Sequence, residues 1–266
     1  MSRLSIVLLT VLSFVAPVPG AAAADIEVVG STTVQPLAES LAEAYEQVDP
    51  SVRITIQGGG SSVGVRSAAD GTADIGAASR EVKESEFAEN PEIVVHTIAR
   101  DGIAIAVNPG VPVAGLTIEE VRGIFSGEIT SWSQVGGPDQ MITVVAREEG
   151  SGTRAAFEEM VMDEVLICLS AILLPSNGAV RTTVSTTPYS IGFLSFGYID
   201  DSVEPLAVDG VDATVENAVS GEYPVVRPLN MITRGQPTGA VAEWLEFILG
   251  PEGQAIVLEE GYLPAG

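Results

Sequence analysis

Hydroxyl-bearing residues beside glycines recur at three places in this chain, and together they could hold an anion. They are Thr32 with Thr33, Ser61 with Ser62, and Ser151 with Thr153 around Gly152. Each set precedes a predicted helix, whose first backbone N–H groups lack partners and carry the positive end of the helix dipole. One such set alone could simply cap its helix. Their joint occurrence after successive predicted strands favours a site for a small oxyanion.

Arg147 could supply a full positive charge to this site. It ends a predicted strand and directly precedes the turn that contains Ser151 and Gly152. A planar guanidinium can donate to two oxygens of a tetrahedral anion. We expect Glu149, two residues further on, to orient Arg147 and to offset part of the cost of burying it. A solvent-facing arginine is the alternative.

A carboxylate in the site would distinguish phosphate from sulfate. The phosphate dianion keeps one proton near neutral pH and sulfate keeps none, so a buried acceptor favours phosphate. Glu149 and Asp74 are the candidate acceptors. Asp74 begins a predicted strand, where an acidic side chain could equally face solvent.

Three predicted strands of the first half position these turns. Residues 26–30, 52–57 and 74–78 read as short strands, and the third ends at Ser79 and Arg80. Strand, small-residue turn and helical pattern follow one another, as in an open α/β sheet. Ligands of such sheets bind beyond the carboxyl ends of the strands, so the turns should converge on one crevice.

The second half repeats this arrangement. The strand 141–146 leads through the Arg147 turn into a helix, and a capping box between Thr117 and Glu120 predicts a helix over 117–125. Two apolar, strand-like stretches, 93–107 and 225–233, are expected to connect two lobes. The apolar stretch 165–174 is interpreted as a buried helix, with an exposed patch that contacts a partner as the alternative.

Composition and missing motifs exclude several classes of function. A net charge of −24, with Lys83 as the sole lysine, makes nucleic acid a poor partner. The single cysteine, Cys168, excludes an internal disulfide and a cysteine-based metal cluster. His96 is the only histidine, and no G-x-S-x-G, H-E-x-x-H or P-loop motif is present. We therefore expect no catalysis, no cofactor and no metal.

The N-terminus is typical of an export signal. A basic start with Arg3 precedes an apolar run from Leu4 to Val15, and alanines at 21–24 suggest cleavage near Ala23 or Ala24. A retained membrane anchor is the competing interpretation, although the run is shorter than the ~20 residues of a spanning helix. We expect an exported protein, located in a periplasm, at the cell surface or outside the cell.

Four ordered blocks then carry a family resemblance. Residues 30–37, 59–64, 74–80 and 147–154 read GSTTVQPL, GGSSVG, DIGAASR and REEGSGTR, and GPEGQAIV at 250–257 adds to them. Together they resemble the PstS family, the phosphate-binding proteins of phosphate ABC transporters. The resemblance implies a type II periplasmic-binding fold, in which two α/β lobes joined by two crossover strands close over one phosphate. It also implies a monomer that hands inorganic phosphate to a membrane-embedded ABC transporter permease.

The resemblance further implies lobe limits and ligand residues. Lobe 1 would comprise residues 25–104 and 230–266, lobe 2 would comprise 105–229, and residues 1–24 would be the signal peptide. The implied ligand contacts are Thr32, Thr33, Ser61, Arg147, Ser151, Gly152 and Thr153, with Ser62 in the same turn as Ser61. Glu149 stands where the family often has an aspartate beside its arginine. Ser79 stands where some members have an aspartate acceptor, which leaves selectivity for phosphate over sulfate open.

Three other functions remain to be separated from phosphate binding. The same fold could bind sulfate, molybdate or tungstate. A protein of another class, an exported hydrolase, could use the serine-rich cleft for turnover. An adhesion or signalling protein could keep the fold without a ligand.

Overall fold

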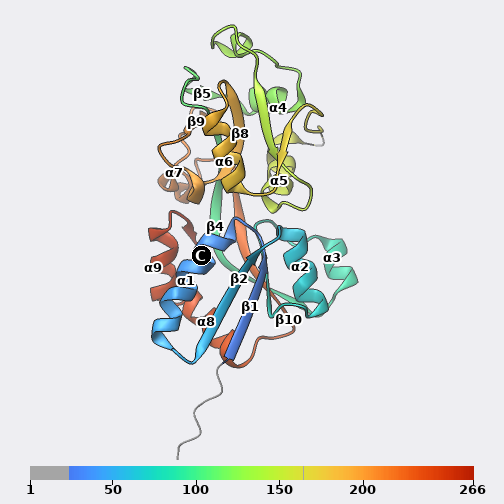
Figure 1. The fold of residues 1–266 in the computed structure, drawn as a ribbon, viewed down its shortest axis with the longest axis vertical. Helices are drawn as coiled ribbons and strands as arrows, with labels where there is room; N and C mark the ends of the chain where they lie inside the picture. Colours follow the sequence, from blue (N-terminus) through green and yellow to red (C-terminus); the bar gives the residue numbers. More distant parts are fainter. Residues whose placement is uncertain (1–23, 164) are drawn as a thin grey trace, which may run out of the picture.

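A computed structural model describes residues 24–163 and 165–266 and shows two α/β lobes stacked along the long axis of the molecule (Figure 1). The long strands β4 (Ile93–Val107) and β10 (Val226–Arg234) run between the lobes. Mixed α/β architecture and two crossover strands agree with the predicted fold class. Residues 1–23 of the predicted signal peptide lie outside the described residues, and its last residue, Ala24, begins strand β1.

Lobe 1 is built from the first third of the chain and its C-terminal tail. Its strands besides β4 and β10 are β1 (Ala24–Gly30), β2 (Val52–Gly58), β3 (Ile75–Ala78) and β11 (Leu263–Pro264). Its helices are α1 (Val34–Val48), α2 (Ser61–Asp70), α3 (Glu84–Glu89), α8 (Gly239–Leu249) and α9 (Pro251–Glu259).

Lobe 2 comprises the middle of the chain. Its strands are β5 (Gly115–Leu116), β6 (Thr143–Arg147), β7 (Ile172–Leu174), β8 (Ser190–Ser195) and β9 (Glu204–Val208). Its α-helices are α4 (Ile118–Ser126), α5 (Gly152–Phe157), α6 (Asn177–Thr186) and α7 (Val215–Ser220). Short 3₁₀ turns cover Trp132–Val135 and Phe196–Tyr198, and a π-helical turn, Glu158–Met162, continues α5.

One continuous strand order, β2-β1-β3-β10-β4-β8-β6-β7, links the two lobes. β1 lies parallel to β2 and β3, so their carboxyl ends share one edge, and β10 is antiparallel to β3 and β4. In lobe 2, β6 runs parallel to β7 and β8. β4 pairs with β10 up to Gly102 and with β8 from Ile103, which is where the chain passes from one lobe to the other.

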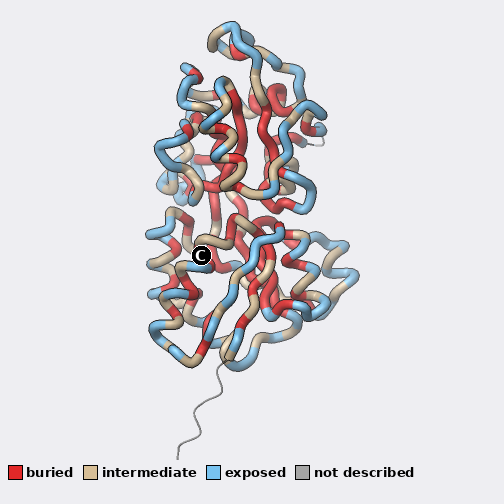
Figure 2. Tube along the Cα trace, in the orientation of Figure 1, coloured by how far each residue is buried: buried red, intermediate tan, exposed pale blue. Residues whose placement is uncertain are grey.

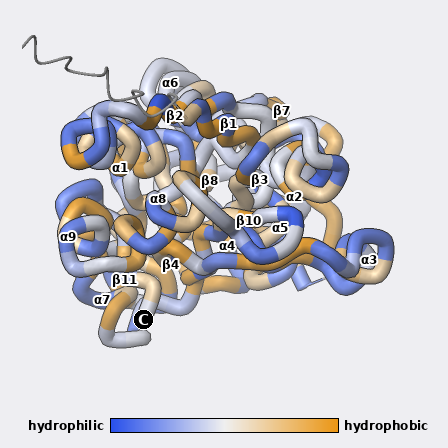
Figure 3. The backbone as a smooth tube through the Cα atoms, turned by 90° about the horizontal axis from the view of Figure 1, so that it is seen from below, coloured by the Kyte–Doolittle hydropathy of each residue, from blue (hydrophilic) through white to orange (hydrophobic). Residues whose placement is uncertain are grey.

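Each lobe has its own hydrophobic core. In lobe 1, Leu37, Leu41 and Trp244 pack beneath the β1–β3 sheet, and in lobe 2 Phe157 stacks on Phe193 with ring centroids 4.2 Å apart. Buried residues occupy the interior of both lobes and continue along the crossover strands between them (Figure 2). Hydrophobic stretches gather around β4 and β10, whereas peripheral α3 is largely hydrophilic (Figure 3). The described helices include none that is both long and apolar enough to cross a membrane.

A glycine contact fixes helix α2 against strand β3. A Cβ atom on Gly64 would overlap the carbonyl oxygen of Ala77 and the backbone of its neighbours, a contact that no real methyl group tolerates. Because Ser61 begins α2 and Ser79 follows β3, this close approach also sets the distance between those two hydroxyls.

The substitution Gly64→Ala is expected to lower the free energy of unfolding by about 1–3 kcal/mol, since backbone must shift to admit the methyl group. Chemical denaturation measures this change. Gly178→Ala is the matched control, because a Cβ on this glycine in α6 would have no neighbour nearer than 3.8 Å. Alanine favours helix by up to ~1 kcal/mol over glycine, so the control should be neutral or stabilised. Equal destabilisation of both variants would contradict the packing argument.

The prediction of a buried helix over Val165–Leu174 is wrong. The segment is a loop followed by the edge strand β7, and Leu166 and Leu169 are 81% and 106% exposed. Ile167 is buried, and the Cys168 amide donates to the Phe125 carbonyl at 2.8 Å, so only the middle of the loop is anchored to the core. The segment is apolar at nearly every position and lacks a helical period, so its pattern could not separate a helix from an exposed loop.

Candidate functional site

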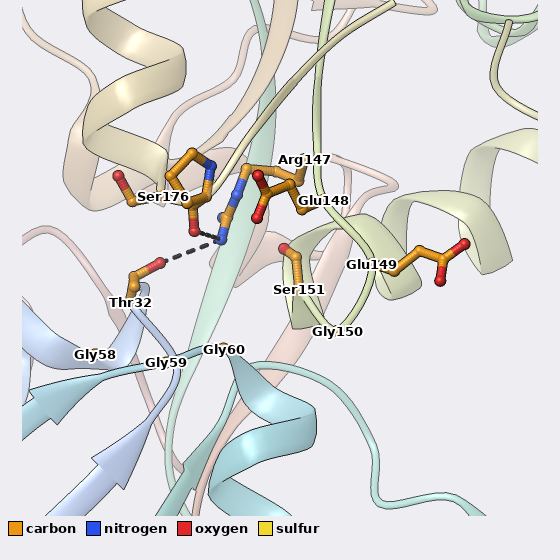
Figure 4. A pocket seen from close by; sticks show the side chains of 11 residues that line it. Thr32, Gly58, Gly59, Gly60, Arg147, Glu148, Glu149, Gly150, Ser151 and Ser176 are labelled. Atoms are coloured by element: carbon orange, nitrogen blue, oxygen red, sulfur yellow. Dashed lines mark hydrogen bonds between the residues drawn. The ribbon is translucent and has the colours of Figure 1, made fainter. Parts of the chain in front are cut away.

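Turns from both lobes meet at the crevice between them. Lobe 1 contributes the β1–α1 loop, the start of α2 and the residues after β3, and lobe 2 contributes the β6–α5 and β7–α6 turns. A cleft of about 340 Å³ opens between them (Figure 4). It is lined by Thr32, Gly58, Gly59, Gly60, Arg147, Glu148, Glu149, Gly150, Ser151, Pro175 and Ser176.

A buried cluster of hydroxyl groups lies deeper in the crevice. The Ser79 hydroxyl is 2.9 Å from the hydroxyl of Ser31 and 3.4 Å from that of Ser61, and the Ser79 amide donates to Ser61 Oγ at 3.0 Å. Gly152 of lobe 2 approaches so closely that a Cβ atom there would overlap Ser61 Oγ. The predicted residues Ser61, Ser79 and Gly152 are thus brought together from different lobes.

The Thr33 hydroxyl connects both lobes and a crossover strand. Its oxygen accepts hydrogen bonds from Asn177 Nδ2 at 2.8 Å and from Arg227 Nη2 at 3.3 Å, and it lies 3.0 Å from Thr153 Oγ1. Because the two donors occupy both acceptor positions of this hydroxyl, its own proton points to Thr153. Thr33 and Thr153, predicted from separate turns, are therefore direct partners.

Arg147 is held in the wall of the cleft with one nitrogen free. Its Nε donates to the Leu174 carbonyl at 3.2 Å, and Nη2 donates to the Pro175 carbonyl at 2.8 Å and to Thr32 Oγ1 at 3.3 Å (Figure 4). Nη1 is buried and has no hydrogen-bond partner in the described part of the chain. A buried charged donor without an acceptor is unfavourable, so this atom points to an anionic ligand.

The charge of Arg147 persists at neutral pH despite its burial. Desolvation, followed by repulsion from Arg227, lowers the pKa of the Arg147 guanidinium to about 10. The Tyr198 and Glu148 groups oppose this shift. Arg147 therefore remains a cation at neutral pH.

A second arginine, Arg227, lies behind the hydroxyl cluster and pairs with Asp101. Arg227 on β10 and Asp101 on β4 are cross-strand neighbours, both are almost fully buried, and Arg227 Nη2 is 2.8 Å from Asp101 Oδ2. Desolvation raises the pKa of the Asp101 carboxyl group, and the Arg227 charge opposes that rise. Hydrogen bonds from Ser195 Oγ and the Phe196 amide also favour the ionised carboxylate.

The expected pairing of Glu149 with Arg147 is wrong. Glu149 is exposed and its side chain turns away from Arg147, whereas Glu148 lies beside the guanidinium (Figure 4). Asp74 is also unsuitable as an acceptor in the crevice, because it is exposed and accepts a hydrogen bond from the Glu27 amide at 2.9 Å, at the start of β3.

Ser62 and Ser151 have local roles in this structure. Ser151 Oγ accepts from the Arg154 amide and so caps α5, as the capping alternative anticipated. Ser62 Oγ accepts from Arg80 Nη2 at 3.3 Å, and the Ser62 amide donates across the crevice to the Gly150 carbonyl at 3.2 Å. By contrast, the Thr33 and Ser61 hydroxyls are not used as caps, and at the start of α1 it is the Ser31 hydroxyl that accepts from the Thr33 and Val34 amides at 3.2 and 3.4 Å.

Two tyrosines brace the β1–α1 loop. Tyr198 of lobe 2 donates its hydroxyl to the Thr32 carbonyl at 2.6 Å, and Tyr262 donates to the Thr33 carbonyl at 3.1 Å. With the Arg147–Thr32 and Thr33–Thr153 contacts, the Tyr198 bond holds the lobes together across the crevice, whereas the Tyr262 bond stays within lobe 1. The structure is therefore a closed form.

Sequence reasoning missed Asp101, Asn177, Arg227 and the tyrosines. A signal existed for the ion pair, because Asp101 and Arg227 interrupt or adjoin apolar stretches predicted to be crossover strands. Charged residues are almost never fully buried without a partner, so each implied an opposite charge nearby. Asn177 gives no such signal, because an asparagine next to Ser176 reads as an ordinary helix start.

Within residues 24–163 and 165–266, no group of three or more His, Cys, Asp or Glu side chains could hold a metal ion. Among the described residues, the buried charges around the crevice are those of Arg80, Arg147, Arg227 and Asp101. Arg80 pairs with Glu86 and Arg227 with Asp101, so Arg147 leaves one net positive charge among neutral hydroxyls and amides. Such a site can bind an anion by charge and hydrogen bonds. Fold and site together define a two-lobed binding protein for a small oxyanion.

Comparison with known proteins agrees with this class. Residues 17–252 match the family described as PBP superfamily domain. The phosphate-binding protein PstS of Bacillus subtilis (strain 168) is 35% identical over 245 residues, which are 91% of this chain and 81% of the relative. PstS of Borreliella burgdorferi is 29% identical and covers 88% of each chain. The chain belongs to the PBP superfamily and, within it, to the PstS phosphate-binding proteins.

Solved structures give the same assignment. A phosphate ABC transporter substrate-binding protein from Clostridium perfringens, solved with bound phosphate, superimposes with a TM-score of 0.87 and 37% identity. The match covers 90% of this chain and 99% of that one. An ABC-type phosphate transport receptor from Vibrio cholerae has a TM-score of 0.75 and 35% identity, with the same coverage.

Proposed function

We propose that this protein captures inorganic phosphate between its two lobes and delivers it to the permease of an ABC transporter. The observation that carries the proposal is the buried Arg147 Nη1, which has no partner in the described residues and lies at a cleft lined by groups of both lobes. The relatives named above are phosphate-binding proteins. Binding is the function, and no step of it makes or breaks a covalent bond.

The proposed ligand set combines both lobes. Thr32, Thr33, Ser61 and Ser79 would contribute from lobe 1, and Arg147, Gly152 and Thr153 from lobe 2. Neutral hydroxyls and amides would spread the charge of the anion, and Arg147 would donate through its free nitrogen. Charge-assisted hydrogen bonds contribute roughly 1.5–3 kcal/mol each, so a few suffice for micromolar or tighter affinity after ordering costs.

Calorimetric titration of the purified protein with phosphate tests the proposal. We expect a single site with micromolar or tighter affinity. The absence of heat, together with an unchanged melting temperature in millimolar phosphate, would contradict phosphate binding. Hydrolysis of a chromogenic phosphate ester by the purified protein, abolished by a serine substitution, would instead support an exported hydrolase.

Sulfate is the second candidate ligand. A free carboxylate in the crevice would favour phosphate over sulfate, but the crevice offers hydroxyl groups instead. Ser79 presents a hydroxyl, Glu149 and Asp74 face solvent, and both oxygens of Asp101 already accept two hydrogen bonds each. The phosphate titration is therefore repeated with sulfate as competitor. Phosphate binding that sulfate does not weaken excludes this candidate, and equal binding establishes it.

We also propose that the protein acts outside the cytoplasm as a monomer, with an N-terminal signal cleaved near Ala23 or Ala24. The basic, apolar and alanine-rich order of the first residues supports this proposal. The intact mass of the protein recovered from the exported fraction tests it, since cleavage removes a defined mass. Recovery of the uncut chain in that fraction would contradict cleavage.

A further inference from the structure

Arg227 on the crossover strand β10 is a charged group of the crevice that neither the sequence pattern nor any relative's description assigns. Its Nε and Nη2 donate to Asp101 Oδ2 at 3.1 and 2.8 Å, and its Nη1 donates to the Ser79 carbonyl at 3.0 Å. These short bonds use three of the five N–H groups of the guanidinium. They fix the plane and direction of Arg227.

The two remaining N–H groups point into the hydroxyl cluster. One on Nη1 contacts Ser79 Oγ at 3.4 Å, and one on Nη2 contacts Thr33 Oγ1 at 3.3 Å. Both distances lie beyond the usual range of strong N–H···O bonds, so these contacts are weak. The oxygens of an anion among Thr33, Ser79 and Thr153 would make shorter and charge-assisted bonds with the same donors.

We propose that Arg227 is a direct ligand of the bound oxyanion and that Asp101 is its positioning residue. The Arg227 guanidinium then presents two N–H donors to the anion from the crossover strand β10, and Arg147 donates to it from lobe 2. This inference rests on the proposed phosphate function and adds a second full charge to it. Because the Asp101 carboxylate also accepts from Ser195 and Phe196 of lobe 2, the anion becomes linked to both lobes through one ion pair.

The double variant Arg227→Gln with Asp101→Asn tests whether the pair binds the anion or only stabilises the fold. The amide introduced by Asp101→Asn can still accept from Ser195 and the Phe196 amide. Its NH₂ group can donate to the carboxamide introduced by Arg227→Gln, so the buried polar groups stay satisfied. We expect a melting temperature within a few degrees of wild type and phosphate affinity at least tenfold weaker. Arg234→Gln with Glu92→Gln removes an exposed ion pair from the far end of the same strand and should not change the affinity.

The outcomes separate this inference from the proposed function. If the wild-type protein binds phosphate and the double variant binds it within twofold, Arg227 is structural and the inference is wrong. If the wild-type protein does not bind phosphate, the proposed function itself is wrong. Should the double variant fail to fold, Arg227→Lys takes its place, because lysine keeps the charge opposite Asp101 but lacks the fork. At least tenfold weaker binding by a folded Arg227→Lys protein supports the inference, and wild-type affinity overturns it.

Discussion

Replacing Arg147 by alanine is expected to weaken phosphate binding roughly a hundredfold or more. Arg147 is 2% exposed, and phosphate oxygens would be the acceptors that the two N–H groups of its Nη1 lack among the described residues. Loss of two charge-assisted bonds at about 1.5–3 kcal/mol each corresponds to at least two powers of ten in the dissociation constant. Calorimetry or phosphate-dependent protection against thermal unfolding measures the loss.

A matched control variant distinguishes the loss of a ligand contact from the general effect of removing an arginine from lobe 2. Arg122 on α4 also belongs to lobe 2 and donates through Nε to a backbone carbonyl, that of Val161, at 2.8 Å. It lines none of the cleft around Arg147. Arg122→Ala should therefore keep wild-type affinity, whatever it does to stability. An Arg147→Ala protein that is folded and binds phosphate like wild type would remove Arg147 from the site.

The general architecture was predictable because it depends on local patterns. Short apolar strands, each followed by a small-residue turn and a helical pattern, specify an open α/β arrangement, and the capping box at Thr117 marked the start of α4 correctly. The meeting of the Thr33 and Ser61 turns follows from this topology, since they follow parallel neighbouring strands of lobe 1, whereas the approach of Thr153 from lobe 2 was implied only by the family resemblance. These features need no knowledge of side-chain contacts between distant segments.

What could not be predicted depends on long-range geometry. The partnership of Asp101 with Arg227 joins residues far apart in the chain, and only the register between β4 and β10 brings them face to face. Glu149 was misjudged because Glu148 and Glu149 are adjacent in the sequence, and the sequence does not reveal which of the two carboxylates the turn places beside Arg147. The exposed loop around Leu169 was misjudged because apolar character alone does not report burial.

Gly152 is expected to be intolerant of even one methyl group, because lobe 1 packs directly against it. In the closed form a Cβ atom there would overlap Ser61 Oγ and would lie 2.6 Å from Ser79 Oγ. Both hydroxyls are buried and hydrogen-bonded, so turning them aside costs about 1–3 kcal/mol for each unsatisfied group. Gly152→Ala should weaken phosphate binding at least thirtyfold while the lobes themselves remain folded.

A double-mutant cycle with Ser61 tests this steric cause. Ser61→Gly alone removes a hydroxyl and weakens binding, but it also removes two of the three atoms nearest to the new methyl group, Ser61 Oγ and Cβ, and leaves only Ser79 Oγ. If the clash with Ser61 is the main cause, Gly152→Ala weakens binding much less once Ser61 is glycine than it does in the wild-type protein, and the two effects are non-additive. Small-angle scattering in saturating phosphate should show Gly152→Ala protein more extended than wild type, and the double variant closed again. Additive losses, or a Gly152→Ala protein as compact as wild type, would mean that Gly152 acts through its backbone conformation rather than through the space that it leaves for Ser61.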